Sequence, residues 1–342
     1  MTGSKWGNRI TRLLPAIGLV MLVLILRSVD LERASAIVSS ADISLLLLSL
    51  CLVAAEAATK TLKLRILTSV HRTCTFGTSL RVYLTGILFG AISPSKVGDF
   101  VKVYTLSQET GLRLMPSLAI VTVERTIEIV CLLTLTALGA VALARIEGID
   151  PLVIASGAAL CACVLAGVWT FSRRIIVRFV KWFFRRLVSV SGGRLGERSF
   201  EAFGHFVWAT YRQPGQLILA MLLGFAAWGV VLVRSYTQAV ALGVSVDFLA
   251  FVLLYPIVIA VELMPISYLG LGTREFAIAY LLAKFNVPVE RAVVLSLLGF
   301  VLTMVPLVLA GYAAVITGDL RHGGDRVAIG GESDGRFVRS DN

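Results

Sequence analysis

Long apolar runs separated by short polar connections extend along most of the chain. Eight of these runs are candidate membrane spans, and they cover about 13–29, 43–59, 117–143, 151–171, 216–234, 248–264, 274–286 and 292–317. Several approach the roughly 17–25 apolar residues that cross a bilayer as a helix. A ninth apolar piece, 80–93, is too short to cross and precedes Pro94, so we expect a re-entrant half-helix. The pattern predicts an all-α fold, a polytopic transmembrane helix bundle of about eight spans with re-entrant or broken helices.

The composition agrees with a membrane protein. Of the 342 residues, 57% are hydrophobic and 15% are charged, and the mean hydropathy is +0.86. A soluble domain of this size could not bury so much apolar surface. The net charge of +11 would suggest a nucleic-acid partner if the chain were soluble. In a membrane protein it is better explained by basic cytoplasmic loops, so we expect the lipid bilayer and no nucleic acid as a partner.

The distribution of Lys and Arg predicts the orientation of the chain in a cell inner (plasma) membrane. The N-terminus, the stretch 60–81 and the C-terminal tail are basic, whereas the connection 30–42 is acidic. The loop 172–215 is the most basic, with Arg173, Arg174, Arg178, Lys181, Arg185, Arg186, Arg194, Arg198 and Arg212. These segments place both termini in the cytoplasm, which agrees with eight crossings.

The predicted membrane domain covers residues 1–317. Its first run, 13–29, is interpreted as a retained span because no small-residue cleavage site follows it. The loop segment 173–190 is basic and aromatic at roughly helical spacing, which favours an amphipathic helix in the headgroup layer, with a plain basic loop as the alternative. The Gly-rich polar segment 318–342 predicts a disordered cytoplasmic tail. The five cysteines form no paired framework, so no disulfide is expected.

The first of three polar interruptions follows the half-helix at 80–93. Pro94 stops the helical ladder, and Gly98 permits an unusual backbone angle. Asp99 can cap a new helix, whose free N–H groups together with Lys96 suit an anionic oxygen. An ordinary turn is the alternative, since Ser, Pro, Gly and Asp are turn residues.

The second interruption lies inside the long apolar run 117–143. Glu124 and Glu128 are four residues apart and share one helix face, and Arg125 can pair with Glu128. Each ionised group near the bilayer centre costs about 2.5–3.5 kcal/mol on insertion scales, so we expect these three to face the bundle interior or a wet cavity. The alternative is a span that begins later, near Ile127, with the charged residues at the interface.

The third interruption separates the runs 248–264 and 274–286. It contains a helix breaker, two flexible positions and a helix start, namely Pro265, Gly270, Gly272, Thr273, Arg274 and Glu275. A tight loop between two spans is the alternative. The first and third interruptions have the same outline in opposite halves of the chain, and such paired broken helices indicate a binding site near the bilayer midplane in transporters.

At these residues the chain resembles the membrane domain of lysylphosphatidylglycerol synthases, which is also found as stand-alone flippase-like proteins. The resemblance covers about residues 10–317, and three motifs carry it: Pro94-Ser-Lys96-x-Gly98-Asp99 with Lys102 and Tyr104, Glu124-Arg125 with Glu128, and Pro265-x-Ser267-x-x-Gly270-x-Gly272-x-Arg274-Glu275. It implies lipid translocation. In the two-domain synthases this part flips the aminoacylated lipid that a cytosolic domain makes, and without that domain lysyl transfer is not expected.

Together, the interruptions and the resemblance predict a flippase-like transporter and not an enzyme. The expected phosphate contacts are Lys96, Arg125 and Arg274. The resemblance implies an anionic phospholipid or a polyprenyl-phosphate-linked glycolipid as the cargo. The carboxylates expected to hold these cations are Asp99, Glu124, Glu128 and Glu275. The resemblance adds to the substrate site Lys102, Tyr104, Ser267, Gly270 and Gly272. No cofactor and no metal are expected, since the three histidines are scattered along the chain.

Two other functions stay open. A membrane-embedded glycosyltransferase could use Asp30 and Glu32, just outside the first span, as catalytic acids, although an acidic outer loop explains them more simply. An accessory scaffold in lipid-linked glycan or hopanoid synthesis is the second alternative. The candidate protein partners are a second copy of the chain and envelope-synthesis enzymes.

Overall fold

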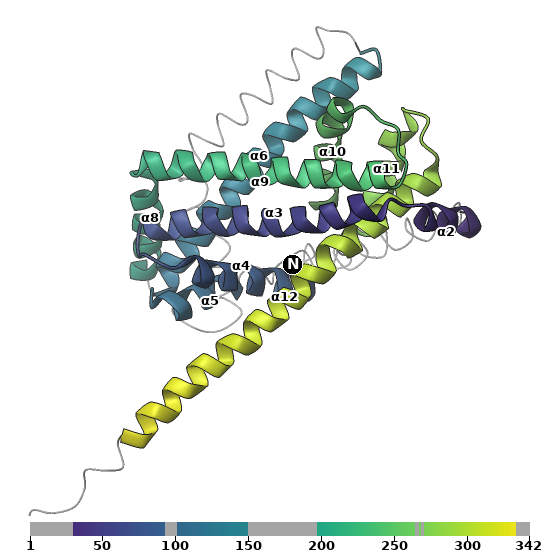
Figure 1. Ribbon diagram of the computed structural model, residues 1–342. Coiled ribbons are helices and arrows are strands. Elements are labelled where there is room, and N and C mark those ends of the chain that lie inside the picture. Colours follow the sequence, from purple (N-terminus) through teal and green to yellow (C-terminus); the bar gives the residue numbers. More distant parts are fainter. Residues whose placement is uncertain (1–29, 93–100, 150–196, 264–266, 268–269, 333–342) are drawn as a thin grey trace, which may run out of the picture.

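The computed structural model describes residues 30–92, 101–149, 197–263, 267 and 270–332, and every regular element in these ranges is an α-helix (Figure 1). In chain order the helices are α2 (Leu31–Ser39), α3 (Ile43–Ser69), α4 (Phe76–Ile92), α5 (Val101–Thr110), α6 (Leu114–Ile146), α8 (Glu197–Tyr211), α9 (Pro214–Ala241), α10 (Phe248–Leu263), α11 (Thr273–Ala283) and α12 (Val289–Glu332). The predicted all-α bundle is confirmed.

Four helices are long and apolar enough to cross a membrane: α3, α6, α9 and the Val289–Thr317 part of α12. They correspond to the predicted spans at 43–59, 117–143, 216–234 and 292–317. The 16 residues of α10 form a shorter apolar helix at the predicted span 248–264. The 11 residues of α11 extend only about 16 Å, which is too short to cross alone. The predicted spans 13–29 and 151–171 and the amphipathic segment 173–190 lie outside the described residues.

Helix α3 is longer than the sequence predicts, and its last part corrects the interpretation of 60–81 as a basic connection. It continues to Ser69, and Lys60 and Lys63 lie within it. No Pro or Gly interrupts residues 60–69, and both lysines meet carboxylates inside the bundle, so nothing ends the helix at residue 59. Similarly, α12 is helical as far as Glu332, past the predicted domain boundary at 317, and no proline follows that boundary.

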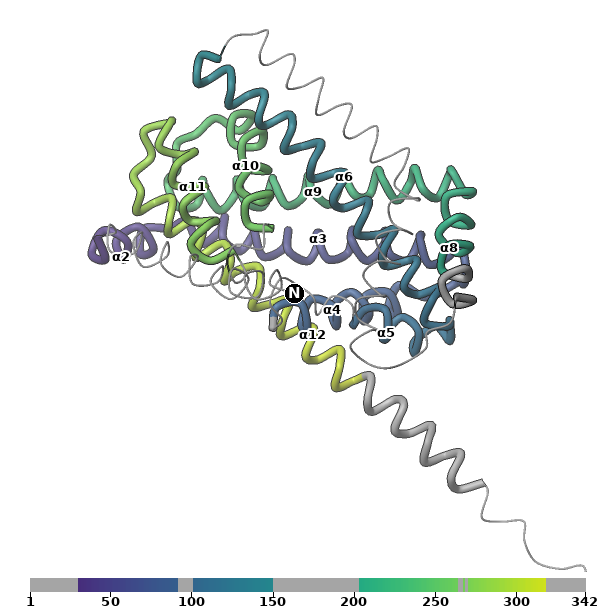
Figure 2. Tube along the Cα trace, turned by 180° about the vertical axis from the view of Figure 1, so that it is seen from behind, coloured from purple at the N-terminus to yellow at the C-terminus, as the bar shows by residue number. Residues whose placement is uncertain are grey.

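The bundle is organised around the antiparallel pair α3 and α9, which lie side by side in Figure 1. The N-terminal end of α3 meets the C-terminal end of α9, where the Asp42 N–H donates to the Ala241 carbonyl at 2.9 Å. Farther along the pair, Lys60 lies 5.6 Å from the Trp228 ring centroid. Helix α6 crosses both obliquely, as seen from behind in Figure 2, and α12 packs against α4 and α11.

Acidic residues of the connection 30–42 serve as helix caps. The Asp30 carboxylate accepts the Glu32 N–H at the start of α2, and the Asp42 carboxylate accepts the Ser44 N–H at the start of α3, both at 2.9 Å. The Ser44 hydroxyl and the Leu45 N–H also donate to Asp42 and lower the pKa of its carboxyl group. A carboxylate in this place satisfies free N–H groups at the helix N-terminus, which explains the acidic character of this connection.

Glycines allow the closest approach between helices. A Cβ atom at Gly139 of α6 would collide with the backbone carbonyl of Leu253 in α10. A Cβ atom at Gly224 of α9 would come within 3.0 Å of Ile127 and Cys131 in α6. On the outside, large apolar side chains remain exposed, as expected for surfaces that face lipid, and they include Ile218, Leu222, Val305 and Leu309.

We predict that Gly139→Ala destabilises the bundle by about 1–3 kcal/mol, because the added methyl group meets backbone that cannot turn away. The matched control is Gly229→Ala, at a helical glycine with no atom within 4 Å of the added methyl group. Thermal unfolding of the purified protein in detergent should show a lower midpoint for the first variant and an unchanged or higher one for the control. Equal midpoints would contradict the close α6–α10 contact.

Candidate functional site

Charged side chains from four helices meet inside the bundle. We call them the central charged cluster, which consists of Glu56, Lys60, Lys63, Lys102, Glu124, Arg125, Glu128 and Arg234. They come from α3, α5, α6 and α9, and α4 adds the Tyr83 ring beside Lys102. Charged groups are costly in a membrane-spanning bundle, so a cluster of this size indicates a functional site.

Glu128 is the best-satisfied carboxylate of the cluster. Lys63 donates to one of its oxygens and Arg125 to the other, each at 2.8 Å. The Lys63 side chain is fully buried, whereas that of Arg125 is 36% exposed. The Trp228 ring N–H also donates to the main-chain carbonyl of Glu128 at 3.3 Å. These contacts join α3, α6 and α9 at one level of the bundle.

Glu124 lies one helical turn away on the same face of α6 and is fully buried. Its Oε1 is 3.9 Å from Lys63 Nζ and 3.7 Å from Lys102 Nζ, both beyond hydrogen-bond length. Neither oxygen accepts a hydrogen bond from the described part of the chain. Lys102 reaches this place because Gly86 of α4 leaves room for its aliphatic chain, where a Cβ atom would collide with it.

Glu56 connects α3 with α9. Lys60 donates to its Oε1 at 2.7 Å, and Arg234 Nε lies 3.3 Å from its Oε2. Arg234 also donates to the Thr303 hydroxyl of α12. All of these side chains are largely buried, so the polar contacts extend from the central charged cluster to α12.

The third sequence motif forms a separate network at the N-terminus of α11. Glu275 accepts the Gly272 N–H at 2.5 Å through one oxygen, and accepts Arg274 and the Ser296 hydroxyl, both at 2.7 Å, through the other. Gly270 and Gly272 have φ angles of +75° and +86°, in the region that favours glycine.

Around this network, the Arg274 guanidinium lies 4.7 Å from the Phe300 ring centroid. The hydroxyls of Ser267 and Thr273 are 2.9 Å apart, and Gly270 packs so closely on Glu262 that a Cβ atom would collide with it. The motif therefore stabilises its own helix break.

One face of α12 joins the two networks. Ser296 contacts Arg274, and Thr303 contacts Arg234. Ser296, Phe300 and Thr303 are spaced four and three residues apart, so they share a face of the helix. Seven residues span about 10 Å along the axis, which places the helix break roughly two turns from the Arg234 contact.

The structure brings together Lys102, Glu124, Arg125 and Glu128, and it brings together the second group of predicted residues, Ser267, Gly270, Gly272, Arg274 and Glu275. Tyr104 does not join either group, because it is 61% exposed. Lys96 and Asp99 lie outside the described residues. Direct phosphate contact by any of these residues stays a prediction.

Sequence reasoning missed four charged members of the cluster and Tyr83. Glu56, Lys60 and Lys63 follow one another at four and three residues, the spacing of one helix face, at the end of an apolar run. This spacing is the sequence signal that could have placed the three residues on one face of a longer helix. Arg234 was a cation at the end of a predicted span. Tyr83 carried no signal, since aromatic residues are common in apolar helices.

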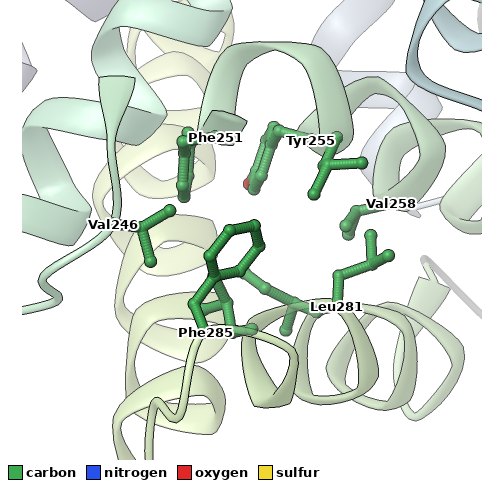
Figure 3. A pocket seen from close by; sticks show the side chains of 9 residues that line it. Val246, Phe251, Tyr255, Val258, Leu281 and Phe285 are labelled. Atoms are coloured by element: carbon green, nitrogen blue, oxygen red, sulfur yellow. The ribbon is translucent and has the colours of Figure 1, made fainter. Parts of the chain in front are cut away.

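A small apolar pocket between α10 and α11 is not suited to bind a charged headgroup (Figure 3). Phe251, Tyr255 and Phe285 face one another across it, and the rest of its lining is aliphatic. It offers no charged group to a headgroup. In the described ranges no group of three His, Cys, Asp or Glu side chains could hold a metal ion.

The fold and the buried charged cluster define a polytopic membrane protein with a polar interior. The family profile described as "Lysylphosphatidylglycerol synthase TM region" matches residues 13–311, and the chain belongs to this family. No curated protein matches the sequence. The family assignment agrees with the resemblance carried by the three motifs.

We predict that Lys63→Met destabilises the protein by about 3–5 kcal/mol, because Glu128 loses a 2.8 Å partner inside the bundle. Lys63→Met combined with Glu128→Leu should recover part of this loss, since the buried carboxylate is removed as well. The matched control is Lys284→Met, which breaks the half-exposed pair with Glu147. Thermal unfolding in detergent measures the stability of all three variants. If the losses caused by Lys63→Met and by Glu128→Leu simply add in the double variant, the two side chains do not interact.

Proposed function

We propose that this protein moves a phosphate-bearing lipid headgroup across the bilayer and that it is not an enzyme. The observation that supports this most strongly is the central charged cluster, in which lysines and arginines lie inside a membrane-spanning bundle. A cation in such a place is costly and is retained where it binds cargo or forms part of a transport path. The cargo is an anionic phospholipid or a polyprenyl-phosphate-linked glycolipid.

The chemistry of the cluster supports a phosphate as the bound group. Lys102 and Lys63 converge on one place from α5 and α3, and Arg125 presents a partly exposed guanidinium next to them. Charge-assisted hydrogen bonds from such donors to phosphate oxygens are short and strong. The apolar outer surfaces of the helices would keep the lipid tails in the bilayer while the headgroup passes through the polar interior.

Arg274 has a different part in this proposal. Its Nε and Nη2 are engaged by Glu275 and Ser296, so it is better suited to hold the helix break than to grip a headgroup. The broken helix would form the second boundary of the path, about two turns along α12 from Arg234. The distribution of basic residues supports an inner-membrane location with both termini in the cytoplasm.

The glycosyltransferase alternative receives less support. Asp30 caps α2, and its second oxygen lies 3.4 Å from Arg33, so a structural role accounts for it. A scaffold would not need the buried Lys102, whose ammonium group lies 3.7 Å from Glu124 and beyond hydrogen-bond length, whereas a carrier of anions would.

We predict that Lys102→Met lowers the rate of headgroup translocation at least about tenfold, because a buried cation that contacts the cargo is lost. The measurement uses protein reconstituted in liposomes with fluorescent phosphatidylglycerol or a fluorescent polyprenyl phosphate, and a reagent that quenches only the outer leaflet. Lys284→Met is the control and should transport at the normal rate. Equal rates in both variants, or glycoside formation from an added sugar donor, would refute the proposal.

A further inference from the structure

Two glutamates on one face of α6 differ sharply in their partners. Each oxygen of Glu128 accepts a 2.8 Å hydrogen bond, one from Lys63 and one from Arg125. Glu124 is fully buried, yet neither of its oxygens accepts a hydrogen bond from the described residues. A buried carboxylate normally has such partners, because its desolvation is otherwise uncompensated. The structure therefore satisfies Glu128 and leaves Glu124 only loosely held.

The loose contacts of Glu124 are both with lysines. Lys63 and Lys102 approach the same oxygen, Oε1, at 3.9 and 3.7 Å from two different helices. Both lysines are buried, and Lys102, unlike Lys63, has no carboxylate at hydrogen-bond distance among the described residues, so its charge needs an anion near it. A phosphoryl oxygen in the same place could accept a charge-assisted hydrogen bond from each, at about 2.7–2.9 Å.

We propose that Glu124 is an internal counter-anion, which occupies the phosphate position between Lys63 and Lys102 while the protein is empty and is displaced when a headgroup phosphate binds. This inference rests on the proposed function and adds a mechanism of release to it. Tyr83 is the proposed neutral donor beside this position: its ring lies 5.2 Å from Lys102 Nζ, and its buried hydroxyl has no hydrogen-bond partner among the described residues.

Competition between Glu124 and the phosphate suits a carrier. Without Glu124, Lys63 and Lys102 would bind a phosphate more strongly and release it more slowly, since affinity differences appear mainly in the dissociation rate. Return of the Glu124 carboxylate replaces the departing phosphate and keeps the lysine charges compensated. Glu128 does not have this role, because its hydrogen bonds to Lys63 and Arg125 fix both side chains.

The test compares two glutamates that lie one turn apart. Glu124→Gln should bind the phosphate probe about tenfold more tightly than the wild type, because a repelling charge is removed, and should transport it more slowly at saturation. Glu128→Gln is the matched control and should bind more weakly and unfold at a lower temperature. Glu124→Asp should fall between the wild type and Glu124→Gln, since the shorter side chain keeps its charge but withdraws it from the lysines.

The probe is phosphatidylglycerol with six-carbon chains, titrated into the full-length protein in nanodiscs, and transport is measured in liposomes with fluorescent phosphatidylglycerol. Tyr83→Phe should weaken binding severalfold without lowering the unfolding temperature, because it removes a hydroxyl that has no partner in the empty protein.

The outcomes separate this inference from the proposed function. If the wild type binds and transports the probe but Glu124→Gln binds it with equal or lower affinity, the counter-anion role is wrong; lower affinity would make Glu124 a direct contact of the headgroup. If the wild type neither binds nor transports phosphatidylglycerol or a polyprenyl phosphate, the proposed function and the inference are both wrong.

Discussion

The fold depends on the compensation of buried charge between α3 and α6. Lys63 is fully buried and shares its charge between Glu128 at 2.8 Å and Glu124 at 3.9 Å. An ammonium group in that position has no access to water, so the two helices must keep the distance at which the carboxylates reach it. The antiparallel packing of α3 on α9 and the oblique crossing of α6 keep Lys63 within reach of both glutamates. The other helices pack around these three.

The two polar networks differ in how fully their charged groups are paired. At the N-terminus of α11, Glu275 satisfies the Gly272 N–H, Arg274 and Ser296 at once, so the helix break is stable without any ligand. The central charged cluster instead contains Glu124 and Lys102, which remain poorly matched among the residues that the structure describes. Natural proteins tend to leave local requirements unmet where function needs them. Under the proposed function, this contrast favours the cluster over the helix break as the place where cargo binds.

The membrane-crossing helices and the second motif could be predicted from the sequence because the signals are local. Apolar runs predict α3, α6, α9 and α12, and two carboxylates at a spacing of four residues mark the interior face of α6. Lys60 and Lys63 could not be assigned correctly, because lysines at the end of an apolar run usually mark the cytoplasmic side. The carboxylate of Glu128, sixty-five residues away along the chain, makes the interior position of Lys63 favourable.

The missing side chain at Gly86 has a mechanical consequence. The aliphatic part of Lys102 fills the space where another residue would carry its Cβ atom, so α4 and α5 interlock at this point. Sliding of one helix along the other has to withdraw the lysine, and its ammonium group then leaves the neighbourhood of Glu124. The contact between α4 and α5 and the position of one buried positive charge therefore depend on the same glycine.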